Sequence, residues 1–346
     1  MDQISAEVLA VAVAMVDGLP NVLTLGQPPA LPAGPLLPSH RSLQAATRAW
    51  VEEQAGRRLG YLEQLYTFAD LGRGPETSGR RISVSYLGLT TPGRPGDTAT
   101  APPFGALPDP AAVPSGSGGP TAPGVGSADD GATAGSLGEP PAPASRPASA
   151  SGGVWTPWYE LFPWEDTREF DLDAFIAPAL RAWAGDDNGR RQRVEIAFGR
   201  TGSGWQPDLV LSRYELLYEA GLIPESPPGL RQARLVGGWR MFGDHRRVLA
   251  TGMARLRAKI EYRPVVFELL PTTFTLRQLQ DCVEALAGRG VHTQNFRRLV
   301  DQQSLVEETG QLADTGGRPA RLYRFRREIL QERHVAGTKL PTTRAK

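Results

Sequence analysis

Two adjacent glutamates, Glu52 and Glu53, are the residues of this chain whose type and spacing best suit metal and phosphate chemistry. Mg²⁺ takes oxygen ligands in near-octahedral geometry and is held in enzymes by carboxylates together with substrate phosphates. Residues at i, i+3 and i+4 of a helix share one face, so a glutamate at position 49 would complete a three-carboxylate cage. Ala49 stands there instead, and the imidazole of His40 prefers softer metals. The residues therefore predict no catalytic group, and Glu52 and Glu53 are the ligands if any metal is bound.

Residues 34–56 resemble a Nudix box, the loop–helix–loop with which enzymes of that family cleave nucleoside diphosphates. Five residues have the type and spacing of the box: Gly34, Arg48, Trp50, Glu52 and Glu53. His40 and Ala49 stand where the family has glutamates, and Ala55 stands where it has a glycine. The resemblance implies a Nudix-like fold, but these departures predict a domain that binds a ligand without hydrolysing it efficiently.

The ligand-binding residues predicted for this vestigial box are Gly34, Arg48, Glu52 and Glu53. We expect no required cofactor, with Mg²⁺ bound only if the Nudix site is competent. The alternative is a Nudix hydrolase, an ADP-ribose-type pyrophosphatase, in which Glu63 supplies a third carboxylate. Adjacent glutamates are also common as solvated residues, and Arg48 with Glu52 would form an ordinary i, i+4 pair on a helix.

Charge is distributed unevenly along the chain, whose 346 residues allow two or three domains. Residues 1–243 hold 19 Lys or Arg and 26 Asp or Glu, whereas residues 244–346 hold 19 and 11. A basic C-terminal part is typical of a nucleic-acid-binding module, although a solvated basic face has the same composition. The single cysteine, Cys282, rules out a disulfide within the chain and is predicted to be a packed core thiol.

The apolar residues 4–16 are predicted to form a buried strand rich in β-branched valines. A signal peptide would begin with basic residues, whereas this segment follows Asp2 and contains Glu7. No stretch of the sequence has the length needed to span a membrane. We therefore expect a cytoplasmic protein with no membrane partner.

Residues 91–153 are of low complexity, because 51 of these 63 residues are Gly, Pro, Ala, Ser or Thr. Such a composition cannot bury enough apolar surface to offset chain entropy, so the segment is predicted to be disordered. It lies between a predicted strand at 82–87 and an aromatic cluster at 155–159, which favours a long insertion inside one domain; an interdomain linker is the alternative. The predicted organisation is a Nudix-like domain over 1–165, a mixed α/β insert or connector over 166–243, a DNA-binding domain over 244–330 and a flexible tail over 331–346.

The connector contains two predicted helices and one predicted strand. The helices cover 170–183 and 209–220, and Gly221 closes the second of them. The strand covers 194–198. Residues 199–204 have the glycines of a phosphate loop but no following Lys-Ser or Lys-Thr, so they form neither a Walker loop nor a dinucleotide fingerprint.

Three helices are predicted at the start of the C-terminal part. A basic helix over 245–262 ends before Pro264, which cannot continue a helix. Thr275 and Gln278 have the spacing of a capping box at the start of the next helix. Thr293 is predicted to cap the helix after it.

Two predicted strands, at 305–308 and 321–325, follow these helices and flank a glycine-bearing turn. Helix, turn, helix and two-stranded ribbon are the plan of a winged helix, whose second helix enters the major groove. Asn and Gln suit adenine edges, and Arg suits guanine or phosphate. The predicted contacts with double-stranded DNA are Gln294, Asn295, Arg297, Arg298, Arg318, Arg321 and Arg324. A winged helix that contacts protein is the alternative.

Two regions together resemble the Nudix-related transcriptional regulators of the NrtR type. In the N-terminal half the box is followed by 61–68 and 81–86, which are similar to the ADP-ribose-type Nudix fold. In the C-terminal part, residues 255–264, 267–271 and 274–280 are similar to the family's junction and first winged-helix element. Residues 295–298 are similar to its recognition helix, and residues 317–325 to its wing.

This resemblance implies an α/β fold class, with a Nudix-like α/β/α sandwich around a mixed sheet and a C-terminal winged helix-turn-helix. It also implies a repressor of pyridine-nucleotide or sugar metabolism that binds a palindromic operator as a homodimer. ADP-ribose or a similar nucleotide would be its effector. The insertion and the connector exceed the compact layout of the family, so the effector and the regulated genes are not carried over to this chain.

Overall fold

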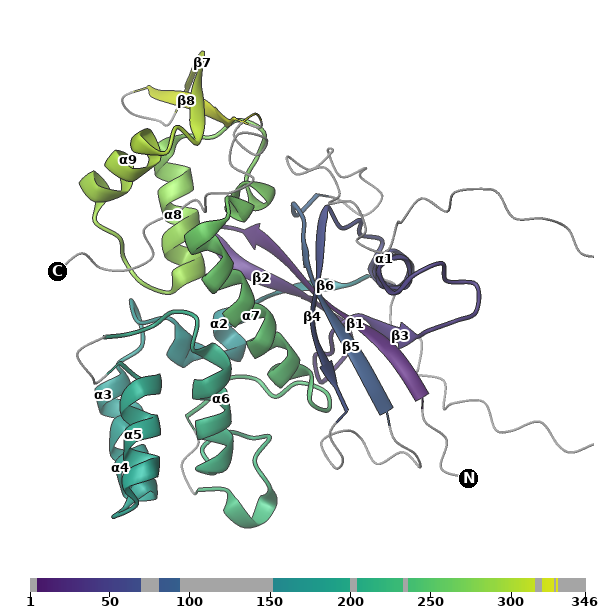
Figure 1. Ribbon diagram of the computed structural model, residues 1–346, viewed down its shortest axis with the longest axis vertical. Helices are drawn as coiled ribbons and strands as arrows, with labels where there is room; N and C mark the ends of the chain where they lie inside the picture. The colour runs from purple at the N-terminus through teal and green to yellow at the C-terminus, as the bar shows by residue number, and fades with distance from the viewer. Residues whose placement is uncertain are drawn as a thin grey trace, which may run out of the picture. The chain divides into compact units, whose positions relative to one another are not determined.

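The computed structural model describes residues 5–69, 81–93, 152–199, 204–232, 236–314, 319–326 and 328. Among these residues the N-terminal half forms a six-stranded mixed sheet in the order β4-β5-β1-β2-β6, with β3 paired to β1 (Figure 1). Its strands are β1 (Ser5–Val16), β2 (Leu19–Thr24), β3 (Ala33–Pro35), β4 (Tyr61–Phe68), β5 (Arg81–Leu89) and β6 (Val154–Pro157). β1 and β5 run parallel, and the other pairs are antiparallel.

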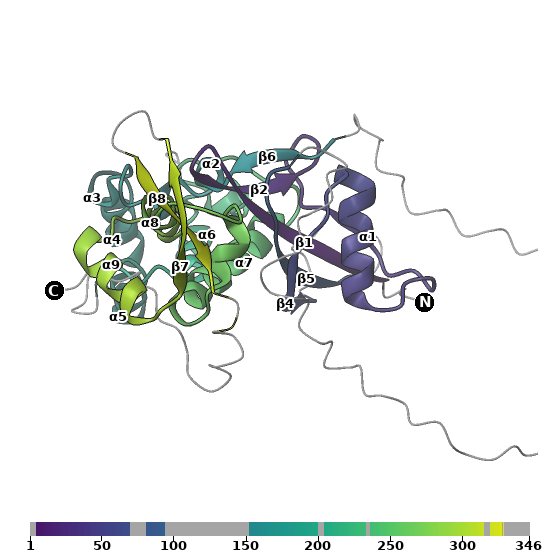
Figure 2. The same ribbon diagram turned by 90° about the horizontal axis from the view of Figure 1, so that it is seen from above.

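Helices cover both faces of this sheet, with α1 (Leu43–Ala55) on one face and α7 (His245–Tyr262) on the other (Figures 1 and 2). The apolar run of β1 explains the arrangement, because successive side chains of a strand point to opposite faces. Val11 packs in the core cluster that includes α7, whereas Ala10 packs in a cluster with Val51 of α1. The predicted α/β/α sandwich is therefore confirmed, as is the buried strand predicted at residues 4–16, whose described part starts at Ser5.

The sheet takes strands from both sides of the low-complexity segment. β6 pairs with β2 in antiparallel register, and Thr24 and Thr156 share a buried hydrogen bond of 2.8 Å between their hydroxyls. Residues 94–151 lie outside the described residues, as do residues 331–346, so the predicted disorder and the predicted tail fall outside the structure. The segment is inserted between β5 and β6 of one sheet.

The connector differs from its prediction at two places. It follows α2 (Trp158–Leu161) and η1 (Pro163–Glu165), which lie in the range predicted as the Nudix-like domain. Its own elements are α3 (Leu172–Phe175), α4 (Ala177–Ala184), α5 (Asn188–Ala197), α6 (Val210–Glu219) and η2 (Pro228–Leu230). The single helix predicted over 170–183 is wrong, because α3 and α4 are separate. Pro178 lies in the first turn of α4 and has no N–H for a helical bond to the preceding turn.

The strand predicted at 194–198 is also wrong, because these residues belong to α5 and its C-terminal cap. Asp187 caps that helix by accepting a hydrogen bond from the Arg190 N–H at 3.0 Å. Val194, Ala197 and Phe198 are buried, which is the spacing of one helical face. The predicted helix at 209–220 is confirmed as α6, with Gly221 in the left-handed region after it.

The C-terminal part begins with α7 and continues as a helix–helix–ribbon module (Figure 1). Its elements are η3 (Val265–Leu269), α8 (Leu276–Ala287), α9 (Thr293–Gln302), β7 (Val306–Ala313) and β8 (Ala320–Phe325). The capping box predicted at Thr275 and Gln278 is present, with both of its hydrogen bonds formed. Thr293 does not cap α9: His292 precedes the helix, and the Thr293 hydroxyl accepts a hydrogen bond from Gln280 instead.

An aromatic core fixes the ribbon against the helices of this module. The rings of Phe267 and Phe325 stack with centroids 4.4 Å apart, and Phe274 exchanges two backbone hydrogen bonds with Tyr323. Cys282 is buried in the same core, and burial raises the pKa of its thiol to about 12. The prediction of a packed core thiol is confirmed. No helix of the described residues has the combination of length and apolar composition that a membrane crossing needs.

Candidate functional site

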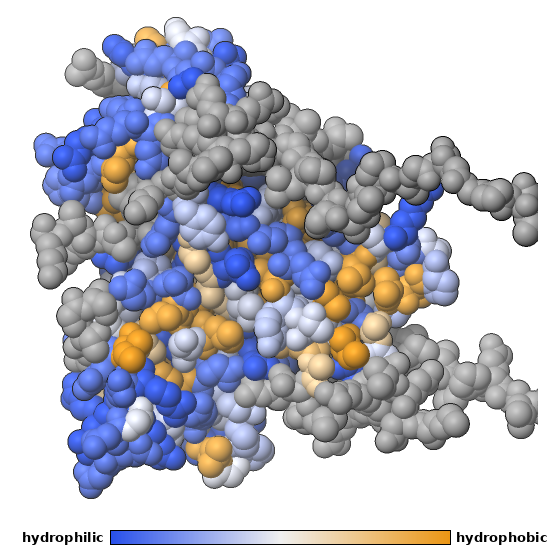
Figure 3. All heavy atoms as spheres, in the orientation of Figure 1, coloured by the Kyte–Doolittle hydropathy of each residue, from blue (hydrophilic) through white to orange (hydrophobic). Residues whose placement is uncertain are grey.

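The second helix of the module, α9, presents polar and basic side chains to solvent. Phe296 and Val300 are buried on its inner face, and Leu299 is half-buried. On the outer face Arg297 and Arg298 are exposed, and neither has an ion-pair partner in the described part of the chain. Figure 3 shows a mostly hydrophilic surface over this end of the molecule. Unpaired guanidinium groups on a recognition helix are available to bind base edges or phosphate.

The other predicted contacts of α9 differ in exposure. Gln294, in its first turn, is exposed, whereas Asn295 is half-buried. The amide of Gln294 can therefore reach a groove without rearrangement. The assignment of all four α9 residues as DNA contacts stays a prediction.

The predicted wing arginines are already paired with acids on the neighbouring strand. Arg321 contacts Glu308 at 2.6 Å, and Arg324 contacts Glu307 at 2.5 Å. All four side chains are largely exposed, so each pair contributes little to stability. The positive charge of these arginines is offset by the glutamates, which was not evident from the sequence. Arg318, predicted at the tip of the wing, lies outside the described residues.

Four basic side chains of α7 likewise form ion pairs within the protein. Arg246, Arg247, Arg257 and Lys259 pair respectively with Glu225, Glu215, Glu165 and Glu63, all from the acidic N-terminal part of the chain. The basic residues of the C-terminal part are therefore not all available to a partner. Arg297 and Arg298 of α9 face solvent, whereas these four residues of α7 are paired with acids of neighbouring elements.

Three residues of the Nudix-like box make contacts that stabilise the fold. A Cβ at Gly34 would stand 2.3 Å from Cε2 of Trp50, so only glycine allows the indole ring to lie against this strand. The indole N–H of Trp50 donates to the Pro35 carbonyl at 3.0 Å. Arg48 donates to the carbonyl oxygens of Leu59 and Gly60.

These contacts hold α1 against the sheet and the loop that follows the helix. Gln54 adds a second anchor, because it both accepts from the Ala33 N–H and donates to the Ala33 carbonyl. Gly34 and Arg48 thus have structural partners within the box, and their predicted contact with a ligand is untested.

The carboxylates of the box do not fit a Nudix metal centre. Glu52 pairs with Arg58 at 2.9 Å, and Ala49 offers no oxygen beside it. Glu53 is exposed on the same helix. Among the described residues no group of three or more His, Cys, Asp or Glu side chains has the arrangement of a metal site. The box therefore offers two carboxylates, one of them in an ion pair, in place of the three-carboxylate cage that a glutamate at position 49 would complete.

Glu63 cannot supply the third carboxylate, because it points to the other face of the sheet. Leu62 packs beside Ala46 of α1, so the next residue of β4 must face α7. There Glu63 accepts hydrogen bonds from Lys259 and from the hydroxyl of Tyr61. The alternative that places Glu63 in a hydrolytic site with Glu52 and Glu53 is therefore wrong in its geometry.

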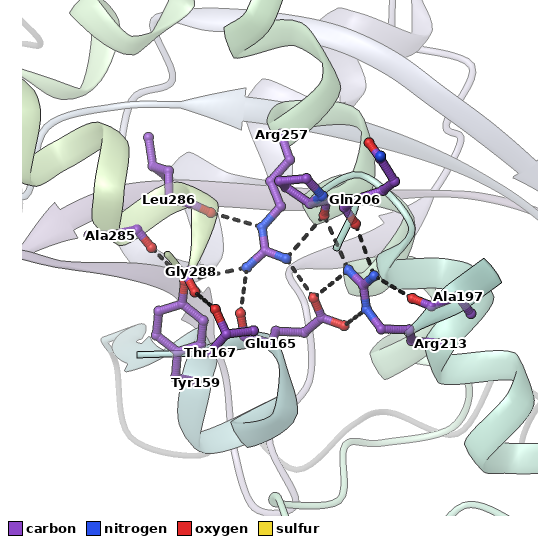
Figure 4. Close-up of polar contacts among 11 residues, drawn as sticks. Tyr159, Glu165, Thr167, Ala197, Gln206, Arg213, Arg257, Ala285, Leu286 and Gly288 are labelled. Atoms are coloured by element: carbon purple, nitrogen blue, oxygen red, sulfur yellow. Dashed lines mark hydrogen bonds and ion pairs between the residues drawn. The ribbon is translucent and has the colours of Figure 1, made fainter. Parts of the chain in front are cut away.

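A group of three fully buried charged residues joins η1, α6 and α7; we call Glu165, Arg213 and Arg257 the buried triad (Figure 4). The Glu165 carboxylate contacts Arg213 at 2.7 Å and Arg257 at 2.5 Å, and the side chains of all three residues are 0% exposed. Burial opposes ionisation of Glu165, but the two guanidinium groups outweigh that penalty and hold the pKa of Glu165 below its ordinary value.

Backbone carbonyls satisfy the remaining N–H groups of the triad. Arg213 donates to the carbonyls of Ala197 and Gln206, each at 2.9 Å. Arg257 donates to the carbonyls of Pro207 and Leu286. A buried ion group needs such additional hydrogen bonds, because attraction between the charges alone does not repay desolvation.

The buried triad was not anticipated from the sequence. Arg257 lies in the stretch read as a basic helix, and its acid partner Glu165 is 92 residues away. A weak signal exists in the segment around Glu165, where an acid follows four aromatic residues in Trp158-Tyr-Glu-Leu-Phe-Pro-Trp164. A carboxylate in such apolar surroundings needs cationic partners.

Comparison with known proteins identifies the C-terminal module. Residues 266–325 match the family of the NrtR DNA-binding winged helix domain. A relative from Acinetobacter baylyi, described as ADPR responsive transcriptional repressor NtrR, is 40% identical over 82 residues. Those residues are 24% of this chain and 33% of that protein, so the match spans about a third of the relative.

The fold is also that of solved structures of NrtR from Shewanella oneidensis. The structure of that protein with a 27mer DNA has a TM-score of 0.51 and 17% identity, over 96% of this chain and 98% of that one. Its structure without DNA has the same TM-score and identity, over 99% of that chain. The predicted combination of a Nudix-like sandwich with a C-terminal winged helix is confirmed.

Proposed function

We propose that this chain, whose residues 266–325 form a winged helix of the NrtR family, is a DNA-binding transcriptional repressor with a Nudix-like sensor domain. The observation that carries the proposal is the outer face of α9. Gln294, Arg297 and Arg298 are exposed there on the helix that enters the major groove in winged helices. The two arginines have no acid partner among the described residues, unlike Arg246, Arg247 and Arg257 of α7 and Arg321 and Arg324 of the wing.

ADP-ribose or a closely related nucleotide is the effector we propose. The relative from Acinetobacter baylyi is described as an ADPR responsive transcriptional repressor. The Nudix-like sandwich is kept around the box, although its carboxylates do not suit a catalytic metal. Sensing by this domain would use affinity for the ligand and need no Mg²⁺, and the predicted ligand residues Gly34, Arg48, Glu52 and Glu53 mark where it would bind.

The proposal includes a homodimer that binds a palindromic operator in the cytoplasm. Helix-turn-helix proteins that bind as dimers read two half-sites related by the two-fold axis of the protein. The effector must bind the DNA-competent and incompetent arrangements with different affinity, since a ligand with equal affinity shifts no equilibrium.

The hydrolase alternative has less support, because Glu63 lies on the face of the sheet away from α1. A winged helix that contacts protein instead of DNA is the other alternative. It leaves unexplained why the exposed face of α9 has Gln294 and two unpaired arginines.

Binding of the full chain to duplex fragments from the regions beside its gene tests the proposal. We expect specific binding whose affinity falls linearly on a log–log plot against salt, and we expect ADP-ribose to change that affinity without Mg²⁺. Absence of salt-sensitive binding to every fragment, with the protein folded, would overturn the assignment and favour a protein-contacting module. In a parallel assay with ADP-ribose and Mg²⁺, product release abolished by Glu53→Gln would support the hydrolase instead.

A further inference from the structure

The C-terminal end of α8 accepts hydrogen bonds from three residues outside the winged helix (Figure 4). The Tyr159 hydroxyl donates to the Ala285 carbonyl at 2.5 Å, and Arg257 Nε donates to the Leu286 carbonyl at 2.8 Å. The Gly288 carbonyl accepts from both the N–H and the hydroxyl of Thr167, each at 2.8 Å. The last carbonyls of a helix have no partner within it and carry the negative end of its dipole, so these donors complete α8.

Close backbone packing accompanies these hydrogen bonds. Gly288 ends α8 with a φ of +68°, and a Cβ there would stand 2.0 Å from the carbonyl oxygen of Glu165. Arg289 also donates to the Trp205 carbonyl at 3.2 Å. The connector and the end of α8 are therefore in direct backbone contact.

The buried triad fixes the donor side of this joint. The guanidinium of Arg257 is held by the Glu165 carboxylate and by the carbonyls of Glu165 and Pro207. These contacts orient the Nε of Arg257 toward the Leu286 carbonyl independently of α8. A planar guanidinium with five fixed donors is well suited to hold several acceptors at once.

The acceptor side is continuous with the DNA-binding surface. Gln280 of α8 donates to the Val291 carbonyl and to the Thr293 hydroxyl, which lie just before and at the start of α9. Glu284 accepts from the Val291 N–H at 3.0 Å. Through these contacts the position of α8 determines the position of α9.

We propose that Glu165, Arg257, Tyr159 and Thr167 form a clamp on the end of α8 that sets the orientation of the winged helix relative to the sensor sheet. The proposal rests on the DNA-binding function proposed above and assigns these four as positioning residues, none of which touches DNA. The clamp limits the orientations of α9 in the free protein, so less entropy is lost when both half-sites of a palindrome are bound. Loosening it weakens DNA binding without removing a DNA contact.

The test compares three variants of the full chain. Tyr159→Phe combined with Thr167→Val removes two hydroxyl donors from the clamp and leaves the buried charges intact. Glu165→Gln removes the charge that holds Arg257, but a change at this buried position can unfold the protein. The double variant Tyr159→Phe/Thr167→Val, called the hydroxyl variant, tests the clamp without changing a buried charge. Glu225→Gln is the matched control, because it breaks another buried ion pair, with Arg246, whose further hydrogen bonds go to the Leu161 and Gly237 carbonyls, outside the winged helix.

Three measurements are made on each variant: affinity for an operator-containing duplex, the slope of that affinity against salt, and hydrogen exchange in the last turn of α8. We expect the hydroxyl variant to exchange faster there and to bind roughly 3- to 30-fold more weakly, the range that one or two hydrogen bonds can account for. Its salt slope should equal that of the wild type, because no phosphate contact is lost. Glu225→Gln should leave both affinity and slope unchanged.

Unchanged affinity of the hydroxyl variant despite faster exchange in α8 would overturn the clamp. An equal loss in Glu225→Gln would also overturn it, because a general loss of stability would then explain the effect. A salt slope lower by about one would show that the clamp region contacts DNA directly, which contradicts the assignment. If the wild type binds no duplex at all, the proposed function fails and the clamp inference falls with it, an outcome distinct from the other three.

Discussion

Arg257 and Lys259 lie two residues apart on α7 and bind carboxylates on opposite sides of that helix. Two residues correspond to about 200° of rotation in an α-helix, so their side chains leave the axis in nearly opposite directions. Arg257 contacts Glu165 of η1, and Lys259 contacts Glu63 of the sheet. One helix therefore contacts the six-stranded sheet on one side and, on the other, the joint between η1 and the end of α8.

Acid should weaken the contact between α7 and the sheet through Glu63. Burial opposes its ionisation, but hydrogen bonds from Lys259 and Tyr61 outweigh burial and hold the pKa of Glu63 below its ordinary value of 4.5. A carboxylate with a lowered pKa contributes stability that is present above its unfolded pKa and is lost as pH falls through its folded pKa. Burial lowers the pKa of Lys259, but a lysine loses its proton only at alkaline pH. Within this pair, the change in stability at acid pH therefore comes from Glu63.

The measurement is the free energy of unfolding in urea between pH 3 and pH 6. Glu63→Gln should flatten the fall in stability below about pH 4.5 and lower the stability at pH 6, because the ionised pair is gone. Glu53→Gln, at an exposed position of α1, is the control and should reproduce the wild-type curve. Parallel curves for wild type and Glu63→Gln would contradict the role of this pair.

Gly34→Ala should destabilise the Nudix-like domain, because the added Cβ would stand 2.3 Å from the Trp50 ring. Overpacking of this kind costs about 1–3 kcal/mol, and the lost packing of α1 on the sheet adds to it. Gly229→Ala is the matched control, since a Cβ there meets no atom within 4 Å. The free energy of unfolding of both variants is measured by chemical denaturation. Equal stability of the two would show that the indole ring can move aside.

Arg298→Ala should weaken binding of operator DNA with little effect on folding, because this side chain is exposed on α9. Loss of a phosphate contact lowers affinity for all sequences and reduces the salt slope by about one, whereas loss of a base contact costs about 1–3 kcal/mol at one position of the site. Arg193→Ala changes an exposed arginine of α5 that pairs with Glu219, and it serves as the control. Fluorescence anisotropy over a salt series measures both variants, and equal affinities would remove α9 from the interface.

Glu307→Gln with Glu308→Gln should strengthen binding to duplexes of any sequence. These acids offset Arg324 and Arg321 on the ribbon, and their removal leaves two unpaired cations beside the predicted DNA surface. The exposed pairs contribute only about 0–1 kcal/mol each to folding, so stability should change little. Asp281→Asn breaks an exposed pair with Arg277 on α8 and is the control. Weaker binding by the double variant would mean that the glutamates orient the arginines toward DNA.

Local sequence patterns determined most elements of this fold. The apolar run at β1, the glycine-ended helix α6 and the Thr275–Gln278 capping box each carry their signal within a few residues. The strand predicted at 194–198 was wrong because a short apolar alternation also fits a helix. In the structure Asp187 caps a helix there, and Val194, Ala197 and Phe198 form its buried face. The exposed face of α9 was predictable because its apolar residues have helical spacing.

The sequence by itself determined that an NrtR-type winged helix follows a Nudix-like domain whose box has lost carboxylates. Only the tertiary structure decided which charged residues are available to a partner, because ion pairs join residues far apart in the chain. It paired the wing arginines with Glu307 and Glu308, turned Glu63 away from α1, and brought Glu165 to Arg257 across 92 residues. Periodicity and motif spacing report local geometry, whereas the partner of a buried charge is set by the packing of whole elements.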